Sequence, residues 1–372
     1  MGILERIADI EHEMSRTQKN KATEFHFGLM KARLAKLKAE LLDPKGSSSS
    51  RGEGFDVAKS GDARAVLVGF PSVGKSTLMS KVTSTKSAIA AYEFTTLTCV
   101  PGRLYYRGSR IQLLDLPGII EGAAQGKGRG RQVIAVAKTA DVILMMLDAT
   151  KGSQQKALLE AELEAVGIRL NSSPPDISVQ VKSAGGICIS STVALTRLGP
   201  DHAKVIGQIL HEYRIFHAQI LFRQDATVDD LIDVLLADSR RYIDCIYCYN
   251  KIDSISLEQV DALARLPYSV VLSCELDLNI DRLVEVMWSR LGLRRVYTKK
   301  PGESPDFSDA IVLRQRDGFR IGDVCSKIHR TLAGDFKFAL VWGTSAKHCP
   351  QRVGLMHELE DEDVIQIIKK RL

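Results

Sequence analysis

Short, nearly uninterrupted apolar runs recur along the chain and predict the strands of a parallel β-sheet. The runs cover residues 65–68, 111–114, 142–147, 243–249 and 269–272. Strands that are buried on both faces show such runs, because neither face meets water. Helix-compatible segments lie between them, which is typical of α/β folds with helices on both sides of the sheet. The pattern predicts an α/β protein built on a parallel sheet.

The first 45 residues follow a helical period instead. Apolar side chains recur every three or four positions within 3–14 and within 29–41, and polar residues 17–21 separate the two stretches. This predicts a helical hairpin over residues 1–45. Its second helix carries the basic residues Lys31, Arg33, Lys36 and Lys38. Charge alone favours a solvated helix face, and the alternative is a surface for RNA or an acidic partner.

The interval between two of the predicted strand ends is too long for the fold. The chain runs 135 positions from Asp115 to Asn250, whereas two helices, two strands and their connections need about 50–60 residues. Alternating apolar residues from 177 to 181 predict that the excess forms a small α+β insertion at about 166–238. Residues 46–62 are expected to form a linker, since 46–54 are rich in Gly and Ser.

The pattern changes again after residue 293, where the sheet domain of 63–293 is expected to end. Basic residues at 294–295 and 299–300 predict a linker-like joint. The elements expected after it are a strand at 310–313, a helix at 324–332, a strand at 338–342 and a last strand at 364–368. This order predicts a compact α+β module within 294–372.

Composition is ordinary for a soluble globular protein of roughly two or three domains. The chain has 372 residues, of which 45% are hydrophobic and 26% are charged. The formal net charge of +6 permits a polyanionic partner without requiring one. No apolar run has transmembrane length and the N-terminus lacks a signal-peptide core, so we expect a cytoplasmic protein with no membrane partner. DNA binding is not expected either.

The seven cysteines have no regular spacing, which argues against a disulfide framework and for a reducing compartment. Cys245 and Cys248 form a C-x-x-C, a spacing that also occurs in metal and redox sites. They lie inside an apolar run with no second pair after it. We therefore predict that both are core cysteines.

A phosphate-binding loop is predicted at 69–76, which matches G-x-x-x-x-G-K-S between a strand and a helix-compatible segment. The glycines allow successive N–H groups to turn toward phosphate oxygens, and the helix N-terminus adds partial positive charge. Lys75 is expected to reach the β- and γ-phosphates, and the Ser76 hydroxyl to bind Mg²⁺. The predicted nucleotide-binding residues here are Gly69, Phe70, Pro71, Ser72, Val73, Gly74, Lys75, Ser76 and Thr77.

A second group of residues is expected around the γ-phosphate. Asp115, at the start of Asp115-Leu116-Pro117-Gly118, is predicted to hold Mg²⁺ through water, and the Gly118 N–H to sense the γ-phosphate. Switch I is expected at Phe94, Thr95, Thr96, Leu97 and Thr98. A threonine there could complete the Mg²⁺ shell, and the alternative is that these threonines only favour β structure.

The base-recognition residues are predicted at the ends of two further strands. In Asn250-Lys251-Ile252-Asp253, the Asp253 carboxylate can accept both guanine N1–H and the 2-amino group, a pair that adenine lacks. A carboxylate left unpaired by the wrong base is costly, so such a site discriminates strongly. Main-chain N–H groups of Ser273, Cys274 and Glu275 are expected to support the base.

Ile119 follows Gly118 at a position where a Ras-type enzyme has the glutamine that orients the attacking water. An aliphatic side chain cannot do this, so we predict slow intrinsic hydrolysis, with the water organised by backbone, a monovalent cation or a partner. Arginines within 122–131 could also supply an arginine finger in cis, an alternative that we do not favour.

With these residues assembled, the chain resembles the developmentally regulated GTP-binding proteins of the Obg group, and most of all their second subtype. The segments that carry the resemblance are 16–23, 54–57, 59–64, 69–77, 92–98, 115–131, 167–171, 297–300, 339–345 and 350–354. The resemblance implies an N-terminal helical hairpin, a GTPase domain with an S5D2-like insertion and a C-terminal TGS domain of β-grasp form.

The resemblance also implies a function: GTP hydrolysis with Mg²⁺, association with ribosomes or RNA, and a dedicated regulatory protein partner. The family pattern selects Thr96 as a catalytic and Mg²⁺-binding residue beside Lys75 and Gly118. Some relatives respond to K⁺ through an asparagine in the phosphate loop, where this chain has Ser72. The usual Ser-Ala-Lys is replaced by Ser273-Cys274-Glu275, in which Cys274 still has a backbone N–H to offer.

Three functional hypotheses therefore follow from the sequence. The first is a GTP-hydrolysing switch, and the second is an RNA- or ribosome-binding adaptor in which nucleotide is mainly structural. Ile119 favours the adaptor. The third, a P-loop ATPase, conflicts with Asp253.

Overall fold

The computed structural model describes residues 2–18, 23–42, 61–83, 101–116, 136–151, 153–199 and 201–370. The chain divides into two compact units, which we describe separately. The hairpin unit comprises Met1–Phe55, Ile119–Lys138 and Lys156–Ile243, and the sheet unit comprises Asp56–Gly118, Thr139–Gln155 and Asp244–Leu372.

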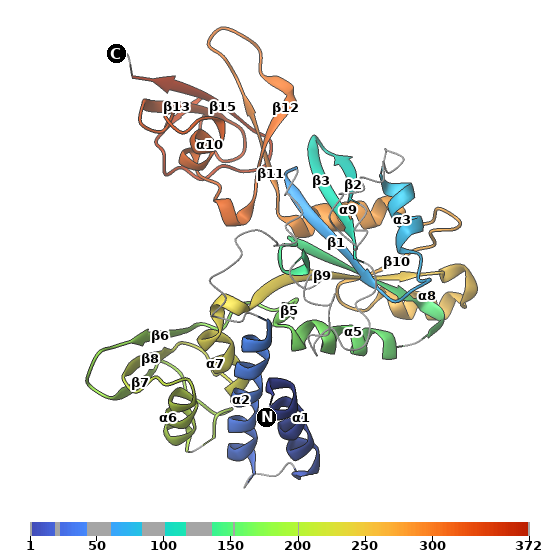
Figure 1. Ribbon diagram of the computed structural model, residues 1–372. Helices are drawn as coiled ribbons and strands as arrows, with labels where there is room; N and C mark the ends of the chain where they lie inside the picture. Colours follow the sequence, from blue (N-terminus) through green and yellow to red (C-terminus); the bar gives the residue numbers. More distant parts are fainter. Residues whose placement is uncertain are drawn as a thin grey trace. The chain divides into compact units, whose positions relative to one another are not determined.

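A mainly parallel sheet organises the first part of the sheet unit (Figure 1). Its strands are β1 (Ala63–Gly69), β2 (Pro101–Tyr106), β3 (Ser109–Asp115), β4 (Val142–Asp148), β9 (Arg241–Asn250) and β10 (Ser269–Val271). They follow the order β10-β9-β4-β1-β3-β2, and β2 alone among these six is antiparallel to its neighbour. All seven residues of β1 and of β4 are buried. The predicted parallel sheet of a P-loop GTPase is confirmed.

The helices α3 (Lys75–Val82) and α9 (Ile280–Leu291) add buried side chains to the core of this sheet, whereas α8 (Leu257–Ala264) has no buried residue. In α9 the buried side chains recur at helical spacing, with Leu283, Met287, Trp288 and Leu291 in the core that also holds Leu67. An amphipathic helix on a sheet removes this apolar stripe from water.

The cysteines of β9 are core residues, as predicted. Cys245 and Cys248 are 1% and 0% exposed, and burial raises the pKa of the Cys248 thiol well above its usual value. Cys274 and Cys325 are buried too, whereas Cys188 and Cys349 are exposed. The Cys248 thiol therefore stays protonated, and the buried cysteines act as small apolar groups.

The C-terminal module is a five-stranded sheet with α10 (Ile321–Ile328) packed against it. Its strands are β11 (Arg294–Thr298), β12 (Asp306–Leu313), β13 (Phe336–Trp342), β14 (Gln351–Val353) and β15 (Asp363–Lys369), in the order β12-β11-β15-β13-β14 (Figure 1). Val296, Val324 and Val341 lie in the core between sheet and helix.

Two expectations for this module were wrong. The predicted joint at 294–295 is part of β11, an inner strand, because Val296 is fully buried and the Arg295 guanidinium is paired with Asp361 at 2.7 Å and Glu362 at 2.6 Å. The helix covers 321–328 rather than 324–332. It begins earlier because the Asp323 side chain accepts the Arg320 N–H at 2.9 Å, the capping contact that marks a helix start.

The hairpin unit combines the N-terminal helices with the predicted insertion. Its elements are α1 (Ile3–Arg16), α2 (Glu24–Leu42), most of α5 (Gln154–Ala165), β5 (Ile168–Leu170), β6 (Ile177–Val181), β7 (Ile187–Ser191), α6 (His202–Glu212), β8 (Ala218–Phe222) and α7 (Val228–Leu235). The sheet has the order β6-β8-β7. α2 packs against α1, α6 and α7 (Figure 1), and Ala32 is fully buried in the core of the insertion.

The basic side chains of α2 are engaged within this unit, so the expected solvated helix face holds only in part. The contacts are Lys31 with Asp229 at 2.6 Å, Arg33 with Glu212 at 3.1 Å, Lys38 with Glu11 at 2.9 Å, and Lys36 Nζ with the Glu212 carbonyl at 2.5 Å. The acidic partners lie on α7, α6 and α1. The charges of α2 therefore fasten the hairpin to the insertion.

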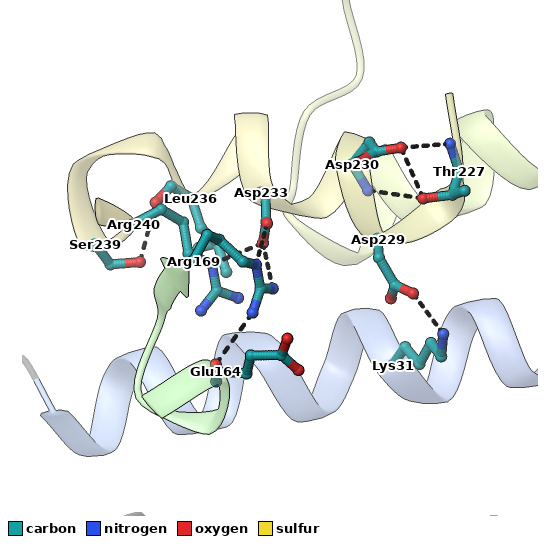
Figure 2. Close-up of polar contacts among 10 residues, drawn as sticks. All are labelled: Lys31, Glu164, Arg169, Thr227, Asp229, Asp230, Asp233, Leu236, Ser239 and Arg240. Carbon is teal, nitrogen blue, oxygen red and sulfur yellow. Dashed lines mark hydrogen bonds and ion pairs between the residues drawn. The ribbon is translucent and has the colours of Figure 1, made fainter. Parts of the chain in front are cut away.

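Asp233 of α7 lies at the centre of a second ionic cluster, shown in Figure 2. Its carboxylate, 7% exposed, accepts from Arg169 Nε at 2.6 Å and Nη2 at 2.8 Å, and pairs with Arg240 Nε at 2.9 Å. One buried carboxylate thus pairs with two guanidinium groups.

None of the helices in the described parts of the chain combines the length and apolar character that crossing a membrane would take.

Candidate nucleotide-binding site

The predicted nucleotide motifs follow neighbouring strands of one sheet. β1 leads into the phosphate loop, β3 ends at Asp115, β9 ends at Asn250, and Ser273 comes shortly after β10. These strands are parallel, so their carboxyl ends meet at one edge of the sheet, the place where α/β sheets bind ligands. All these residues belong to the sheet unit.

The phosphate loop depends on glycine at two positions. Gly74, the residue before α3, has φ +95°, a conformation that side chains disfavour. A Cβ atom on Gly74 would lie 2.3 Å from Asn250 Nδ2, and one on Gly69 would lie 2.5 Å from the Met146 carbonyl oxygen. The loop therefore folds tightly against β4 and the base-recognition motif.

The Lys75 ammonium lies inside the phosphate loop. Its Nζ donates to the carbonyl oxygens of Gly69 and Phe70, each at 2.8 Å, and the residue is only 9% exposed. Burial lowers the pKa of Lys75, and the nearby Asp115 charge acts in the opposite direction. A cation held in this position is ready to pair with phosphate oxygens.

Ser76 and Asp115 form the part of the predicted Mg²⁺ site that the structure describes. The Ser76 hydroxyl donates to Asp115 Oδ2 at 3.2 Å. A hydroxyl and a carboxylate side by side suit Mg²⁺, which prefers oxygen ligands and keeps phosphate and water in its shell. No group of three or more His, Cys, Asp or Glu residues suited to a metal occurs in the described ranges, so this pair is the candidate.

Asn250 joins the phosphate loop to the base-recognition loop. Its Nδ2 donates to the Val73 carbonyl at 2.8 Å, and its Oδ1 accepts the Cys274 N–H at 2.9 Å. The Cys274 N–H, expected to face the base, is thus donated to Asn250 here. Burial raises the pKa of the Cys274 thiol to about 11, so the side chain is neutral.

The Asp253 carboxylate, the predicted guanine acceptor, is held by two serine hydroxyls. Its Oδ1 accepts from Ser273 Oγ at 2.5 Å and its Oδ2 from Ser254 Oγ at 3.2 Å. The Ser273 hydrogen bond, the largest influence, lowers the pKa of Asp253 below its ordinary value. The carboxylate is therefore ionised at neutral pH and keeps acceptor capacity for a base.

Asp148 is a site residue that the sequence analysis missed. It ends β4, is 4% exposed, and accepts from Lys251 Nζ at 2.8 Å and from Thr150 Oγ1 at 2.6 Å. Burial, the largest influence, raises its pKa, but the hydrogen bonds from Lys251 and Thr150 outweigh burial and the pKa is lowered. The sequence feature that could have identified Asp148 as a site residue is its position directly after the apolar run 142–147.

Some predicted residues have other positions. Leu116 is 1% exposed, so its side chain lies in the core and does not face a ligand. Its N–H donates to the Leu67 carbonyl, which fixes the backbone next to Asp115. Val73 is likewise a core side chain. The predicted residues Phe94, Thr95, Thr96, Leu97, Thr98, Pro117 and Gly118, and also Ile119, lie outside the described residues.

Comparisons with known proteins show which family this chain resembles over its whole length. The family described as 50S ribosome-binding GTPase matches residues 64–179, the C-terminal region of the same domain matches 184–293, and the TGS domain matches 294–369. Developmentally-regulated GTP-binding protein 2 of Homo sapiens is 63% identical over 370 residues, which is 100% of both chains. Its homologue in Dictyostelium discoideum is 61% identical over the same span.

Similarity to solved structures is weaker. The cytosolic domain of the FeoB iron transporter of T. maritima, in a GDP form, has a TM-score of 0.35 and 16% identity. The match covers 62% of this chain and 64% of that chain. A TM-score this low adds nothing to the assignment.

Proposed function

The chain belongs to the family of developmentally regulated GTP-binding proteins, and we propose that it is a molecular switch that hydrolyses GTP slowly. The observation that carries this proposal is the ionised Asp253 carboxylate at the same sheet edge as Lys75 and the Ser76–Asp115 pair. Asp253 would recognise guanine, and Lys75 and the Ser76–Asp115 pair would bind the phosphates and their Mg²⁺.

The switch would work through the residues around the γ-phosphate. Ser76, Asp115 and Thr96 would hold Mg²⁺, which neutralises charge on the β- and γ-phosphates when it is bound. GTP would order Thr96 and Gly118, and loss of the γ-phosphate would release them. The carbonyl oxygens of Gly69 and Phe70 hold the Lys75 ammonium in the loop, where it would pair with the β- and γ-phosphates.

Slow turnover follows from Ile119, which cannot orient a water molecule. We propose that a partner or a monovalent cation supplies this function. K⁺ is the candidate activator, although Ser72 replaces the asparagine that some relatives use. Comparing turnover in KCl and in NaCl tests K⁺, and equal rates would reject it.

The proposed setting is translation in the cytoplasm, with ribosomes or RNA and a dedicated regulatory protein as partners. Support comes from the match to the family described as 50S ribosome-binding GTPase and from the match to the TGS domain. Cosedimentation with ribosomes in GDP and in a non-hydrolysable GTP analogue tests it. We expect more protein in the ribosome pellet with the GTP analogue, and equal amounts in both nucleotides would contradict a switch.

The second candidate is an adaptor in which nucleotide is structural, and Ile119 is the observation in its favour. Lys75→Ala separates the two. Loss of both multiple-turnover hydrolysis and ribosome association would reject the adaptor. Loss of hydrolysis alone, with ribosome association kept, would reject the switch. ATP displacing bound GDP as well as GTP does would remove the guanine assignment.

A further inference from the structure

A lysine outside the nucleotide motifs ties the phosphate-loop helix to the base-recognition loop. Lys81 lies in the last turn of α3, the helix that begins at Lys75. Its Nζ lies 2.6 Å from Asp277 Oδ1 and donates to the Glu275 carbonyl at 3.3 Å. Asp277 belongs to the loop 273–279, which joins β10 to α9. The contact spans 196 positions of sequence.

Two residues of the loop 273–279 have a left-handed backbone conformation. Asp277 has φ +55° and Asn279 φ +61°, in the left-handed region that non-glycine residues adopt only when their surroundings enforce it. Two backbone hydrogen bonds between Ser273 and Leu278, at 3.2 and 3.0 Å, close the loop. Asn279 Nδ2 also donates to the Val271 carbonyl at 2.7 Å. Contacts that hold Asp277 therefore help to maintain the whole turn.

The turn controls the hydroxyl that orients Asp253. Ser273 Oγ accepts the Leu276 N–H at 3.3 Å and donates to Asp253 Oδ1 at 2.5 Å. Leu276 is next to Asp277 in the chain. A loop that relaxes at Asp277 would therefore shift the donor to Ser273, and with it the direction of the Asp253 carboxylate.

The charges of the loop suit a cation from α3. The loop carries the carboxylates of Glu275 and Asp277, and Lys81 supplies the positive charge that pairs with Asp277. We propose that Lys81 is a positioning residue for guanine recognition: its ion pair with Asp277 holds the loop in the conformation in which Ser273 directs Asp253 toward the base. This inference rests on the proposed function of Asp253 as the guanine acceptor.

The size of the effect follows from exposure. The Lys81 side chain is 27% exposed and that of Asp277 is 69% exposed, so solvent screens the pair. We expect GDP to dissociate about fivefold faster without it, the factor that corresponds to ~1 kcal/mol for one exposed ion pair. High salt should weaken the same pair, so the difference from the wild type should shrink as ionic strength rises.

The test uses the full-length protein and a fluorescent GDP analogue whose dissociation is followed by stopped flow. We expect Lys81→Met and Asp277→Asn each to speed dissociation, and the double variant to be no faster than either alone. The charge swap, Lys81→Asp with Asp277→Lys, should restore slow dissociation. Multiplicative effects of the two single variants would overturn the proposal, because they would show that the side chains act independently.

A second readout separates positioning from general stabilisation. IDP lacks the 2-amino group that Asp253 accepts, so a well-placed carboxylate binds GDP more tightly than IDP. We expect Lys81→Met to reduce the ratio of the GDP and IDP affinities. A lowered melting temperature with an unchanged ratio would mean a purely structural contact and would overturn the proposal.

Two control variants make the outcome unambiguous. Arg265→Met removes a more exposed ion pair, with Asp261 2.8 Å away at the C-terminal end of α8, and should leave GDP dissociation unchanged. Asp253→Asn tests the premise. If it leaves GDP affinity unchanged, the guanine function of Asp253 and the Lys81 proposal both fail. If it weakens GDP binding while Lys81→Met has no effect, the Lys81 proposal alone fails.

Discussion

Gly74 of the phosphate loop packs directly against Asn250 of the base-recognition motif. We predict that Gly74→Ala weakens GDP binding and lowers the free energy of unfolding by about 1–3 kcal/mol. The reason is twofold: the backbone has φ +95°, and the new Cβ would lie 2.3 Å from Asn250 Nδ2. Titration calorimetry measures the affinity. Urea unfolding followed by tryptophan fluorescence measures stability, since Trp288 and Trp342 both lie in the sheet unit.

Gly207→Ala is the control for this change, and its unfolding is followed by circular dichroism because Gly207 lies in the hairpin unit, which contains neither tryptophan. Gly207 lies in α6, where the nearest atom to a new Cβ is Ile187 Cδ1 at 4.0 Å. An alanine in a helix should stabilise the protein by about 0.5–1 kcal/mol. A Gly74→Ala protein that binds GDP with wild-type affinity would contradict the tight packing of the loop.

The Asp148–Lys251 pair predicts a specific pH dependence. The folded-state pKa of Asp148 is lowered, so the stability that this carboxylate contributes is complete above its ordinary pKa of 3.8 and is lost as the pH falls through the lower folded value. We expect Lys251→Met to cost about 1–2 kcal/mol at neutral pH, since hydrogen bonds to charged groups contribute this much and Lys251 is 40% exposed.

In the Lys251→Met variant the stability lost on acidification should be smaller, because without the Lys251 hydrogen bond the folded-state pKa of Asp148 is less depressed relative to its unfolded value. Urea unfolding at a series of pH values from neutral to acid measures both effects. An identical acid profile in wild type and variant would show that Lys251 does not set this pKa.

At the residue scale the sequence predicted side chains that follow strands, and it missed those whose partners are distant. Asp115, Asn250 and Asp253 could be found because a parallel sheet brings strand ends together. Lys81 could not, because its significance depends on Asp277, which lies in a loop of special backbone conformation. A charge on a helix surface carries no local sign of its partner.

On α7, two aspartates one turn apart have different environments (Figure 2). Asp233 is 7% exposed and serves Arg169 and Arg240, whereas Asp229 is 52% exposed and pairs with Lys31. We predict that Asp233→Asn lowers the free energy of unfolding by about 3–5 kcal/mol, the cost of leaving buried charges uncompensated. Asp229→Asn should cost about 0.2–1 kcal/mol, as exposed pairs do.

Circular dichroism during urea unfolding measures both variants, and each serves as the control for the other. Equal costs would show that burial of Asp233 does not decide the energetics of the cluster. Both substitutions keep the size of the side chain, so they remove the charge with little change in packing.

The element scale shows where local patterns misled. The charges of α2 suggested a solvated face, yet their partners Asp229 and Glu212 lie about 180–200 positions away in sequence. The basic start of β11 suggested a joint, yet Arg295 is neutralised by Asp361 and Glu362. Periodicity identified α1, α2 and β6 because their apolar residues recur at helical or strand spacing. Elements whose charges are neutralised over long distances give no such signal.

At the scale of the whole molecule, β9 is one continuous strand with a part in each unit. Its residues 241–243 pair with β5, and 244–250 pair with β4 and lead to Asn250. Any coupling between the proposed binding of nucleotide and of ribosomes must be reciprocal. If a GTP analogue raises the affinity for ribosomes, ribosomes must raise the affinity for the analogue by the same factor, typically about 5- to 150-fold.

Measuring the dissociation constant of the analogue with and without ribosomes checks this linkage. Lys75→Ala, which should not respond to nucleotide, is the control. Unequal factors in the two directions would show that a third component takes part in the equilibrium.

The distribution of cysteines has a practical consequence for spectroscopy. Of the described thiols, Cys188 in the hairpin unit and Cys349 in the sheet unit are exposed, while Cys245, Cys248, Cys274 and Cys325 are buried. Once Cys99 is replaced by serine, a maleimide dye should modify two thiols in the native protein and all six after denaturation. The natural sequence thus supplies one dye position in each unit, and energy transfer between the two dyes could follow their separation through the nucleotide cycle without any engineered cysteine.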